Sequence, residues 1–297
     1  MKKIIVTTTI NSPTIATKKF ANMKNWQLVV VGDKKTPHKE YEKLDCIYLH
    51  PDHQEKKYPE LSLALGWNTI QRRNIGFIEA YKLGADVMAT VDDDNIPYEN
   101  WGKNLYIGKE IEVDTWQPEY DIFDPLSVTN HNDLWHRGYP IENVHIKNRV
   151  DYVGKTKRLV KIQADLWDGD PDIDATCRLT KMPTVKFDVK EPYCSTVLSP
   201  FNSQNTFIAR ERIPYYFMYP YVGRMDDIWA SYDLQKIFQN SLIYNSATVY
   251  QQRNEQDLIK NLSDEVLGYR NTTSYIHGKY SLPKSTQHAY NIYKGIF

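Results

Sequence analysis

The sequence predicts an α/β protein in which a mostly parallel β-sheet is flanked by helices. Three observations support this prediction. Strand-like and helix-like runs alternate over about the first 95 residues. Residues 28–31, Leu-Val-Val-Val, are apolar on both faces, as expected for a central parallel strand. Polar or acidic clusters follow the predicted strands, at the sheet edge where ligands bind in such folds.

The first predicted elements follow one another closely. Residues 3–8 form a β-branched run that favours a strand. A helix is expected to begin at Ser12-Pro13, with serine as the N-cap and proline at the first helical position. Residues 28–31 form the second strand and residues 46–49 the third.

The next helix and strand lead into an acidic cluster. A helix is expected from about Asn68 to Gly84, and a strand covers residues 87–91. The loops at residues 9–11, 32–35 and 92–94 leave the carboxyl ends of their strands. We therefore expect them to converge on one crevice.

The chain beyond residue 100 is irregular and rich in aromatic residues, with helices expected over 227–238 and 256–267. No domain boundary is visible. We expect a single domain, with residues 1–100 as a nucleotide-binding half and residues 101–297 as an acceptor-binding half.

Charge and cysteine usage exclude several classes of protein. Lys plus Arg and Asp plus Glu both total 37, so the chain lacks the basic excess of most nucleic-acid-binding proteins. Three dispersed cysteines form no zinc or disulfide pattern. The apolar run near the start is too short for a signal peptide, and no stretch reaches membrane-spanning length. A cytoplasmic location is expected.

Asp92, Asp93 and Asp94 carry the strongest chemical signal. Clustered carboxylates after a buried strand repel one another unless a cation is present, and hard oxygen ligands suit Mn²⁺ or Mg²⁺. Alternate residues of an extended segment point the same way, so Asp92 and Asp94 are the expected metal ligands. Asp92 could also hold a ribose. The alternative is a solvated acidic turn.

Nucleotide contacts are expected from residues close to the same crevice. The guanidinium of Arg73 could grip a phosphate, although a surface arginine is the alternative. Thr8, Asn11, Asp33 and Lys34 lie at the ends of the first two strands and are further candidates.

A second acidic cluster covers residues 167–174, Trp-Asp-Gly-Asp-Pro-Asp-Ile-Asp. It lacks the glycine and glutamate spacing of a calcium-binding EF-hand. We expect Asp168, Asp170 and Asp172 to hold sugar hydroxyls, with Trp167 as a stacking face. A purely structural, hydrogen-bonded loop is the competing interpretation.

Asp226 and Asp227 stand at the start of the helix expected over 227–238. One carboxylate could serve as an N-cap. Asp227 is the expected general base, accepting a proton from an acceptor hydroxyl.

Eight segments, in order along the chain, together resemble a known family. They are residues 5–14, 27–37, 73–76, 84–85, 92–95, 137–140, 166–175 and 202–206. They are similar to the STELLO-type glycosyltransferase-like family and, more distantly, to the reversibly glycosylated polypeptides, which are UDP-arabinopyranose mutases.

This resemblance implies a GT-A-like fold, a nucleotide-diphosphate sugar, most naturally a UDP-sugar, and a divalent metal at Asp92 and Asp94. It places Asp33 in a nucleotide-proximal loop and Asn205 in a substrate-binding segment. GT-A enzymes often have a histidine ligand near the C-terminus, for which His277 or His288 is available, although an ordinary surface histidine is the favoured alternative for each.

The expected function is transfer of a sugar from a UDP-sugar to a hydroxyl of a glycan or lipid-linked acceptor, with surface polysaccharide synthesis as the suggested setting. The aromatic tail at residues 290–297 could contact a membrane that carries such an acceptor, or pack on the domain. The two rival functions are a UDP-sugar mutase and a non-catalytic scaffold for other transferases.

Overall fold

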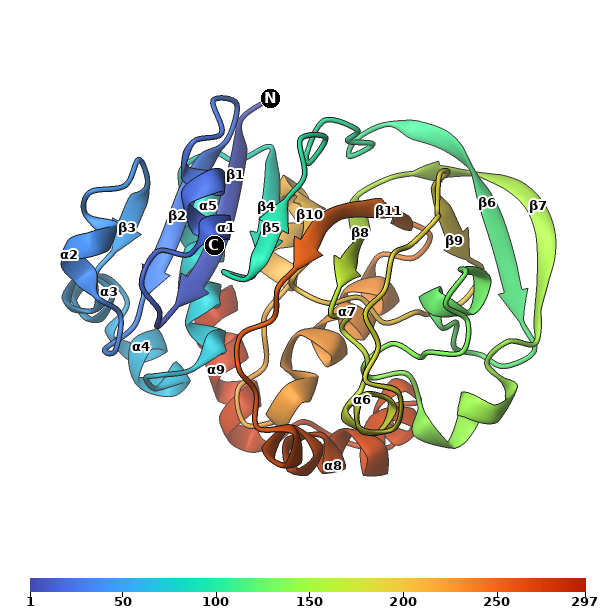
Figure 1. The fold of residues 1–297 in the computed structure, drawn as a ribbon. Helices are drawn as coiled ribbons and strands as arrows, with labels where there is room; N and C mark the ends of the chain where they lie inside the picture. The colour runs from blue at the N-terminus through green and yellow to red at the C-terminus, as the bar shows by residue number, and fades with distance from the viewer.

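The computed structural model covers residues 1–297 and is built on one large β-sheet with helices on both faces (Figure 1). The strands lie in the order β3-β2-β1-β4-β10-β8-β11-β9-β6-β7, and β5 pairs with β11 off this path. Their bounds are β1 (Lys3–Thr9), β2 (Gln27–Gly32), β3 (Ile47–Leu49), β4 (Val87–Val91), β5 (Asn95–Pro97), β6 (Glu110–Pro118), β7 (Val150–Leu159), β8 (Ile162–Gly169), β9 (Tyr193–Ser195), β10 (Asn205–Ala209) and β11 (Leu242–Gln251).

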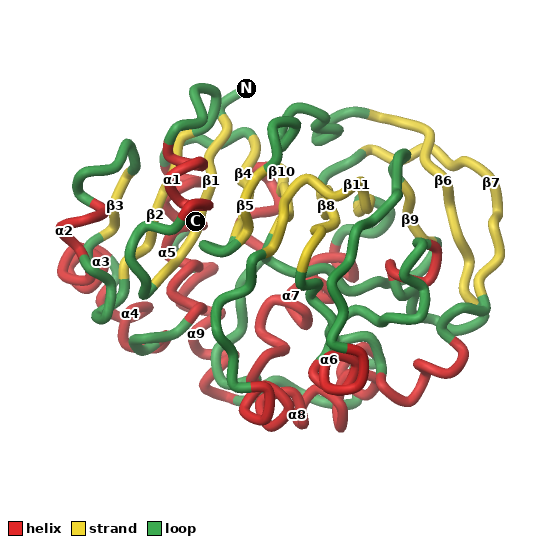
Figure 2. The backbone as a smooth tube through the Cα atoms, viewed as in Figure 1, coloured by secondary structure: helices red, strands yellow, loops and turns green.

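Nine α-helices and five short 3-10 helices connect and cover the strands (Figure 2). The α-helices are α1 (Ile15–Ala21), α2 (His38–Tyr41), α3 (Pro51–Lys57), α4 (Pro59–Leu65), α5 (Arg73–Lys82), α6 (Ala175–Lys181), α7 (Asp226–Ile237), α8 (Leu258–Ile276) and α9 (Lys284–Lys294). The 3-10 helices are η1 (Ile70–Arg72), η2 (Pro125–Val128), η3 (Ile141–Ile146), η4 (Arg210–Tyr215) and η5 (Gly223–Met225).

The first part of the sheet is parallel and the remainder is mixed. Strands β3, β2, β1 and β4 all run the same way, as the alternating pattern predicts. Strand β10 is antiparallel to both of its neighbours, β4 and β8, and β6 and β7 form an antiparallel pair. The α/β class is confirmed, and the expectation of a mostly parallel sheet applies to the first four strands.

Alternating side chains of β1 supply two separate cores. Ile4 and Val6 pack in the core that contains α5, whereas Ile5 packs in the core that contains Phe20 of α1. Helix α5 lies very close to the sheet, because a Cβ at Gly76 would stand 2.4 Å from Cγ1 of Val6. The strand is therefore buried on both faces, as a central strand should be.

Two helix starts differ from the sequence-based expectation. Helix α1 begins at Ile15, with Thr14 as its N-cap: the Thr14 hydroxyl accepts a hydrogen bond from the Thr17 amide at 3.1 Å. This threonine, and not Ser12, satisfies the free amides of the first turn. The helix before β4 starts as η1, and α5 begins at Arg73, later than expected.

The sheet runs without interruption through both halves of the chain, because β10 pairs directly with β4, with Asn205 opposite Val91. The C-terminal helix α9 lies beside α4 and η4, and the buried hydroxyl of Tyr293 donates to the carbonyls of Ile213 and Tyr216. The tail thus packs on the domain, which is one of the two alternatives that the sequence left open. None of the helices has the length and apolar content to cross a bilayer.

Candidate functional site

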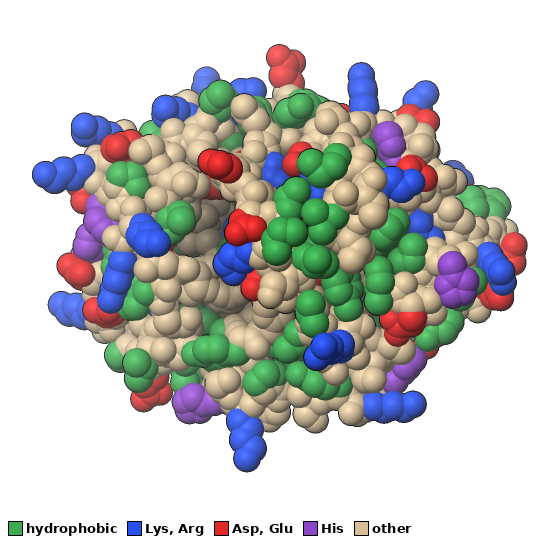
Figure 3. Space-filling view, turned by 60° about the horizontal axis from the view of Figure 1, so that its bottom comes forward, with side chains coloured by type: hydrophobic (Ala, Val, Ile, Leu, Met, Phe, Trp, Pro, Cys, Tyr) green, Lys and Arg blue, Asp and Glu red, His purple; other side chains and the backbone are tan.

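A cavity of about 480 Å³ lies at the carboxyl end of β4, beside the start of α7. We call it the Asp92 cavity. Figure 3 shows a hollow in this side of the molecule with acidic and basic side chains at its edge. Five carboxylates and four cationic side chains line the Asp92 cavity: Asp92, Asp94, Asp226, Asp227 and Asp264, with Arg137, Arg224, Arg253 and Lys260. A lining of this kind suits a highly polar ligand that carries charge.

The loops after β1, β2 and β4 meet, as the sequence predicts. The Asp93 carboxylate accepts hydrogen bonds from the Thr9 hydroxyl at 2.5 Å and from the Asn11 amide group at 2.9 Å. The Thr36 hydroxyl donates to the Thr9 carbonyl at 2.6 Å, which joins the second loop to the first. Asp93 therefore connects the loop after β4 to the loop after β1 by hydrogen bonds. Asp92 and Asp94, on either side of it, line the Asp92 cavity.

Asp92 is held in place by Arg73. The Arg73 Nη2 atom donates to Asp92 Oδ1 at 2.6 Å, and Nη1 donates to the carbonyl and hydroxyl of Ser203. The arginine side chain is 1% exposed and does not line the cavity. Arg73 therefore positions Asp92 from behind the cavity wall, a placement that disagrees with the expectation that it grips phosphate.

Asp94 has a buried oxygen without a partner. Its Oδ2 atom accepts a hydrogen bond from the Asn254 amide at 3.1 Å, whereas its Oδ1 atom is buried and makes no hydrogen bond. Burial, followed by the charge of Asp92, raises the pKa of Asp94 to about 6. Burial also raises the pKa of Asp92, although Arg73 opposes that shift. A cation would relieve these strains on both carboxylates.

This pair of carboxylates fits a hard divalent cation. No group of three or more His, Cys, Asp or Glu side chains converges as a complete metal cage. Mg²⁺ usually takes one or two carboxylates and completes its shell with water and substrate phosphates, and Mn²⁺ also prefers oxygen ligands. His277 pairs with Asp121, His288 lies in α9, and neither lines the Asp92 cavity. Neither histidine therefore lies where it could join these two carboxylates, which agrees with the alternative of ordinary surface histidines.

Three further residues at the Asp92 cavity have buried polar atoms without partners. They are Gln204, Gln251 and Arg253. The Arg253 side chain is only 7% exposed, and its Nε atom lies 3.3 Å from Asp170 Oδ1 in an ion pair but makes no hydrogen bond. Buried polar groups are normally satisfied, so these atoms have hydrogen-bonding capacity left for water or a ligand. The sequence analysis missed Arg253, although its polar segment directly follows β11 just as residues 92–94 follow β4.

The two carboxyl groups that begin α7, Asp226 and Asp227, have pKa values shifted in opposite directions. Burial alone would raise the pKa of Asp227, but the ion pair with Arg137 at 2.9 Å outweighs it and lowers the pKa. Asp226 accepts a hydrogen bond from Gln71 at 2.8 Å. Burial, followed by repulsion from Asp227, raises the pKa of Asp226 to about 7. A general base needs a pKa near the working pH, so Asp226 suits that role and Asp227 does not.

The Trp167 segment is part of the core. Trp167 is 3% exposed and stacks on Phe187, with ring centroids 5.9 Å apart. Asp168 accepts hydrogen bonds from the Tyr98 hydroxyl at 3.0 Å and from the Phe187 amide at 2.9 Å. These side chains have no free face for a sugar, so the competing structural interpretation fits them.

Asp170 and Asp172 form ion pairs within the chain, and the side chain of Asn205 forms hydrogen bonds within the chain. Asp170 pairs with Arg178 and Arg253. The fully buried Asp172 pairs with Arg137 at 2.9 Å, and this contact lowers its pKa although burial opposes the shift. The Asn205 amide group bonds to the Leu166 carbonyl, among others, and its oxygen accepts from Trp101. None of the three lines the Asp92 cavity, which corrects their expected role in binding substrate.

The remaining nucleotide candidates lie behind or beside the cavity. The Thr8 hydroxyl donates to the Val31 carbonyl at 2.8 Å. Asp33 accepts a hydrogen bond from the amide of Thr69, a residue that does line the Asp92 cavity. Lys34 lies over the ring of Trp67. Asp33 therefore shapes the cavity wall, and neither Thr8 nor Lys34 contributes to it.

Comparison with known proteins gives a distant relationship. No family model matches the chain. Two proteins from Arabidopsis thaliana, named "Probable glycosyltransferase STELLO2" and "Probable glycosyltransferase STELLO1", are each 25% identical to it over 226 and 227 residues. The match covers 69% of this chain and 29% of each relative, so the chain spans less than a third of their length. The resemblance to the STELLO-type family is confirmed as a distant one.

Two solved structures are similar in overall shape. Both are glucosyl-3-phosphoglycerate synthase from Mycobacterium tuberculosis, one in complex with phosphoglyceric acid and one with Mn²⁺, uridine diphosphate and phosphoglyceric acid. Each has a TM-score of 0.48 and covers 95% of this chain, with 9% and 10% sequence identity and 81% and 80% of their own chains covered.

Proposed function

We propose that this chain, a distant relative of the STELLO-type proteins, is a metal-dependent glycosyltransferase that uses a UDP-sugar and a hydroxyl acceptor. The observation that carries the proposal is the unsatisfied polar lining of the Asp92 cavity. Asp94 has a buried oxygen with no hydrogen-bond partner, and Arg253 has a buried nitrogen whose contact with Asp170 at 3.3 Å does not form a hydrogen bond; both residues line the same cavity. A divalent cation and a diphosphate would satisfy these two atoms together.

The donor would lie between the acidic and the basic parts of the cavity. Asp92 and Asp94 would hold Mn²⁺ or Mg²⁺, which neutralises diphosphate charge when it is bound. The guanidinium of Arg253 has the fork of donors that recognises phosphate oxygens. Arg73 keeps Asp92 oriented through its 2.6 Å contact, so the acidic side is fixed before the donor arrives.

Asp226 acts as the general base. Its ionised carboxylate takes the proton from the acceptor hydroxyl while that oxygen forms a bond to the anomeric carbon of the sugar. The bond between that carbon and the phosphate oxygen breaks, and UDP leaves with the electron pair. Asp227 and Arg137 form a buried pair at the start of α7 and hold Asp226 at the cavity wall.

The acceptor is a hydroxyl compound, for which a glycan or a lipid-linked sugar in polysaccharide synthesis is the proposed class. Radiolabelled UDP-sugars incubated with and without hydroxyl acceptors test this reaction directly. We expect UDP release that depends on acceptor and on metal. Formation of an isomeric UDP-sugar without acceptor would instead identify a mutase, and metal-independent UDP binding without turnover would favour a scaffold.

Replacing Asp94 with asparagine tests the metal assignment. Asp94→Asn keeps the shape but removes the charge, so calorimetry in saturating Mn²⁺ should show UDP affinity at least about tenfold weaker. Asp188→Asn is the control, because Asp188 is exposed and lies outside the Asp92 cavity. Unchanged UDP affinity in Asp94→Asn would show that no metal bridges this carboxylate and the nucleotide.

A further inference from the structure

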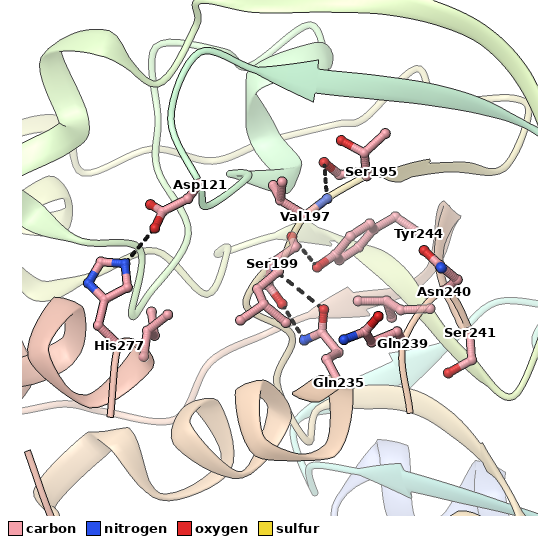
Figure 4. Close-up of a pocket in the computed structure, with 14 residues that line it drawn as sticks. Asp121, Ser195, Val197, Ser199, Gln235, Gln239, Asn240, Ser241, Tyr244 and His277 are labelled. Carbon is pink, nitrogen blue, oxygen red and sulfur yellow. Dashed lines mark hydrogen bonds and ion pairs between the residues drawn. The ribbon is translucent and has the colours of Figure 1, made fainter. Parts of the chain in front are cut away.

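A second cavity of about 410 Å³ shares no residue with the Asp92 cavity. It lies among the loop after β9, the end of α7, the start of β11 and the end of α8 (Figure 4). Leu242, the first residue of β11, lines this second cavity, and Gln251, the last residue, lines the Asp92 cavity. Leu242 and Gln251 lie opposite Ile162 and Gly169 of β8, so at about 3.3 Å per residue the two ends of β11 lie about 23 Å apart.

The floor of the second cavity is preformed and buried. The Gln235 side chain exchanges two hydrogen bonds with the backbone of Ser199: its amide group donates to the carbonyl at 2.7 Å, and its oxygen accepts from the amide at 3.2 Å. The Ser199 hydroxyl lies 2.6 Å from the Tyr244 hydroxyl, which donates to the Pro200 carbonyl. Figure 4 shows the contacts of Ser199 with Gln235 and with Tyr244. A floor with satisfied polar groups stays in place without a ligand.

The rim, in contrast, offers hydrogen-bonding groups that have no partner in the chain. Gln239 and Asn240 are exposed, and neither side-chain amide makes an internal hydrogen bond. On another side, His277 pairs with Asp121, which joins the end of α8 to the loop after β6. The Asp121 carboxylate and the His277 ring of the lining are therefore already paired with each other.

The character of the lining selects the ligand. The second cavity has no Lys or Arg, so it offers nothing to hold a phosphate, a nucleotide or an acidic chain. Its apolar part consists of small aliphatic patches such as Val197, Leu198 and Ile276, which are interspersed with hydroxyls and amides. A ligand that suits this surface is uncharged, has many hydroxyl groups for the polar side chains, and has small apolar C–H surfaces that can pack against the aliphatic side chains. The volume lies within the range of about 300–1,000 Å³ that is typical of small-molecule sites.

We propose that the second cavity binds a neutral oligosaccharide. Such a site would hold a glycan at a place remote from the Asp92 cavity. The inference does not depend on the transfer reaction proposed above, because the lining residues of the two cavities are different.

Calorimetry and ligand-observed NMR with cellohexaose, maltohexaose and chitohexaose test the proposal, with hexagalacturonate as the charged comparison. The main variant combines Gln239→Ala with Asn240→Gly. Glycine is chosen because Asn240 has a φ of 57°, which alanine would adopt with strain. Asn132→Ala is the matched control, since Asn132 is an exposed amide outside both cavities.

We expect at least one neutral hexasaccharide to bind, and the double variant to weaken that binding about tenfold, since two amide hydrogen bonds are lost. Val197→Trp, which fills the cavity, should abolish binding, while Asn132→Ala and Asp94→Asn should leave it unchanged. UDP binding should survive in the double variant. Three results would overturn the proposal: no binding of any neutral hexasaccharide, loss of binding only in Asp94→Asn, or preference for hexagalacturonate.

Discussion

Arg137 is the cation between two buried carboxylates, and its replacement with methionine tests whether this ion-pair cluster holds the start of α7. The arginine donates three hydrogen bonds to Asp172 and two to Asp227, and these carboxylates are 0% and 3% exposed. Removing one partner of a buried pair typically costs about 3–5 kcal/mol, because a charge is left uncompensated. For 297 residues this corresponds to a fall in Tm of about 5–8 °C.

Thermal unfolding followed by circular dichroism at neutral pH measures this fall. Arg149→Met is the control, because its ion pair with Glu119 is about 60% exposed and such pairs contribute at most about 1 kcal/mol. Adding Asp172→Asn to Arg137→Met should recover part of the loss, since one stranded charge disappears. The reasoning is refuted if Arg137→Met and Arg149→Met lower the Tm by the same small amount.

Three further predictions concern the base, the donor site and the packing of α5. Asp226 has a pKa of about 7, so transfer activity should rise with pH through about 7, and Asp226→Asn should lose at least about a hundredfold in kcat and flatten the pH profile. Between about pH 4 and 7, Asp226 keeps its proton in the folded protein but loses it in the unfolded chain, so the free energy of unfolding falls as pH rises across that window. Chemical denaturation should show a smaller fall in Asp226→Asn. Arg253→Met should weaken UDP binding about tenfold in calorimetry; unchanged affinity would remove Arg253 from the donor site. Gly76→Ala should cost about 1–3 kcal/mol in urea unfolding because its Cβ meets Val6, whereas Gly295→Ala, with no contact under 3.5 Å, should be neutral.

Local patterns in the sequence were sufficient for the elements that position the site. The run of residues 87–91 and the acidic cluster after it predict a buried strand that leads into a polar loop, and the structure has both. The start of α7 was expected at Asp227 and lies at Asp226. These features depend on neighbours within a few residues, which the sequence displays directly.

Local sequence patterns could not predict which charged side chains pair with one another in the folded protein. Arg137 meets Asp227 across 90 positions, and Asp92 meets Arg73 across 19, so their pairing depends on the complete fold. The same is true of Trp167, whose face is covered by Phe187. An isolated motif therefore shows which groups are available, whereas burial decides which of them remain free to act.

The pairing of β10 with β4 has a mechanical consequence. Backbone hydrogen bonds join the two halves of the chain along the register from Asn205 to Ala209. The halves therefore cannot move apart as rigid domains about a flexible hinge. Any motion at the Asp92 cavity is therefore confined to the segments that border it, such as residues 252–257, which have no regular secondary structure.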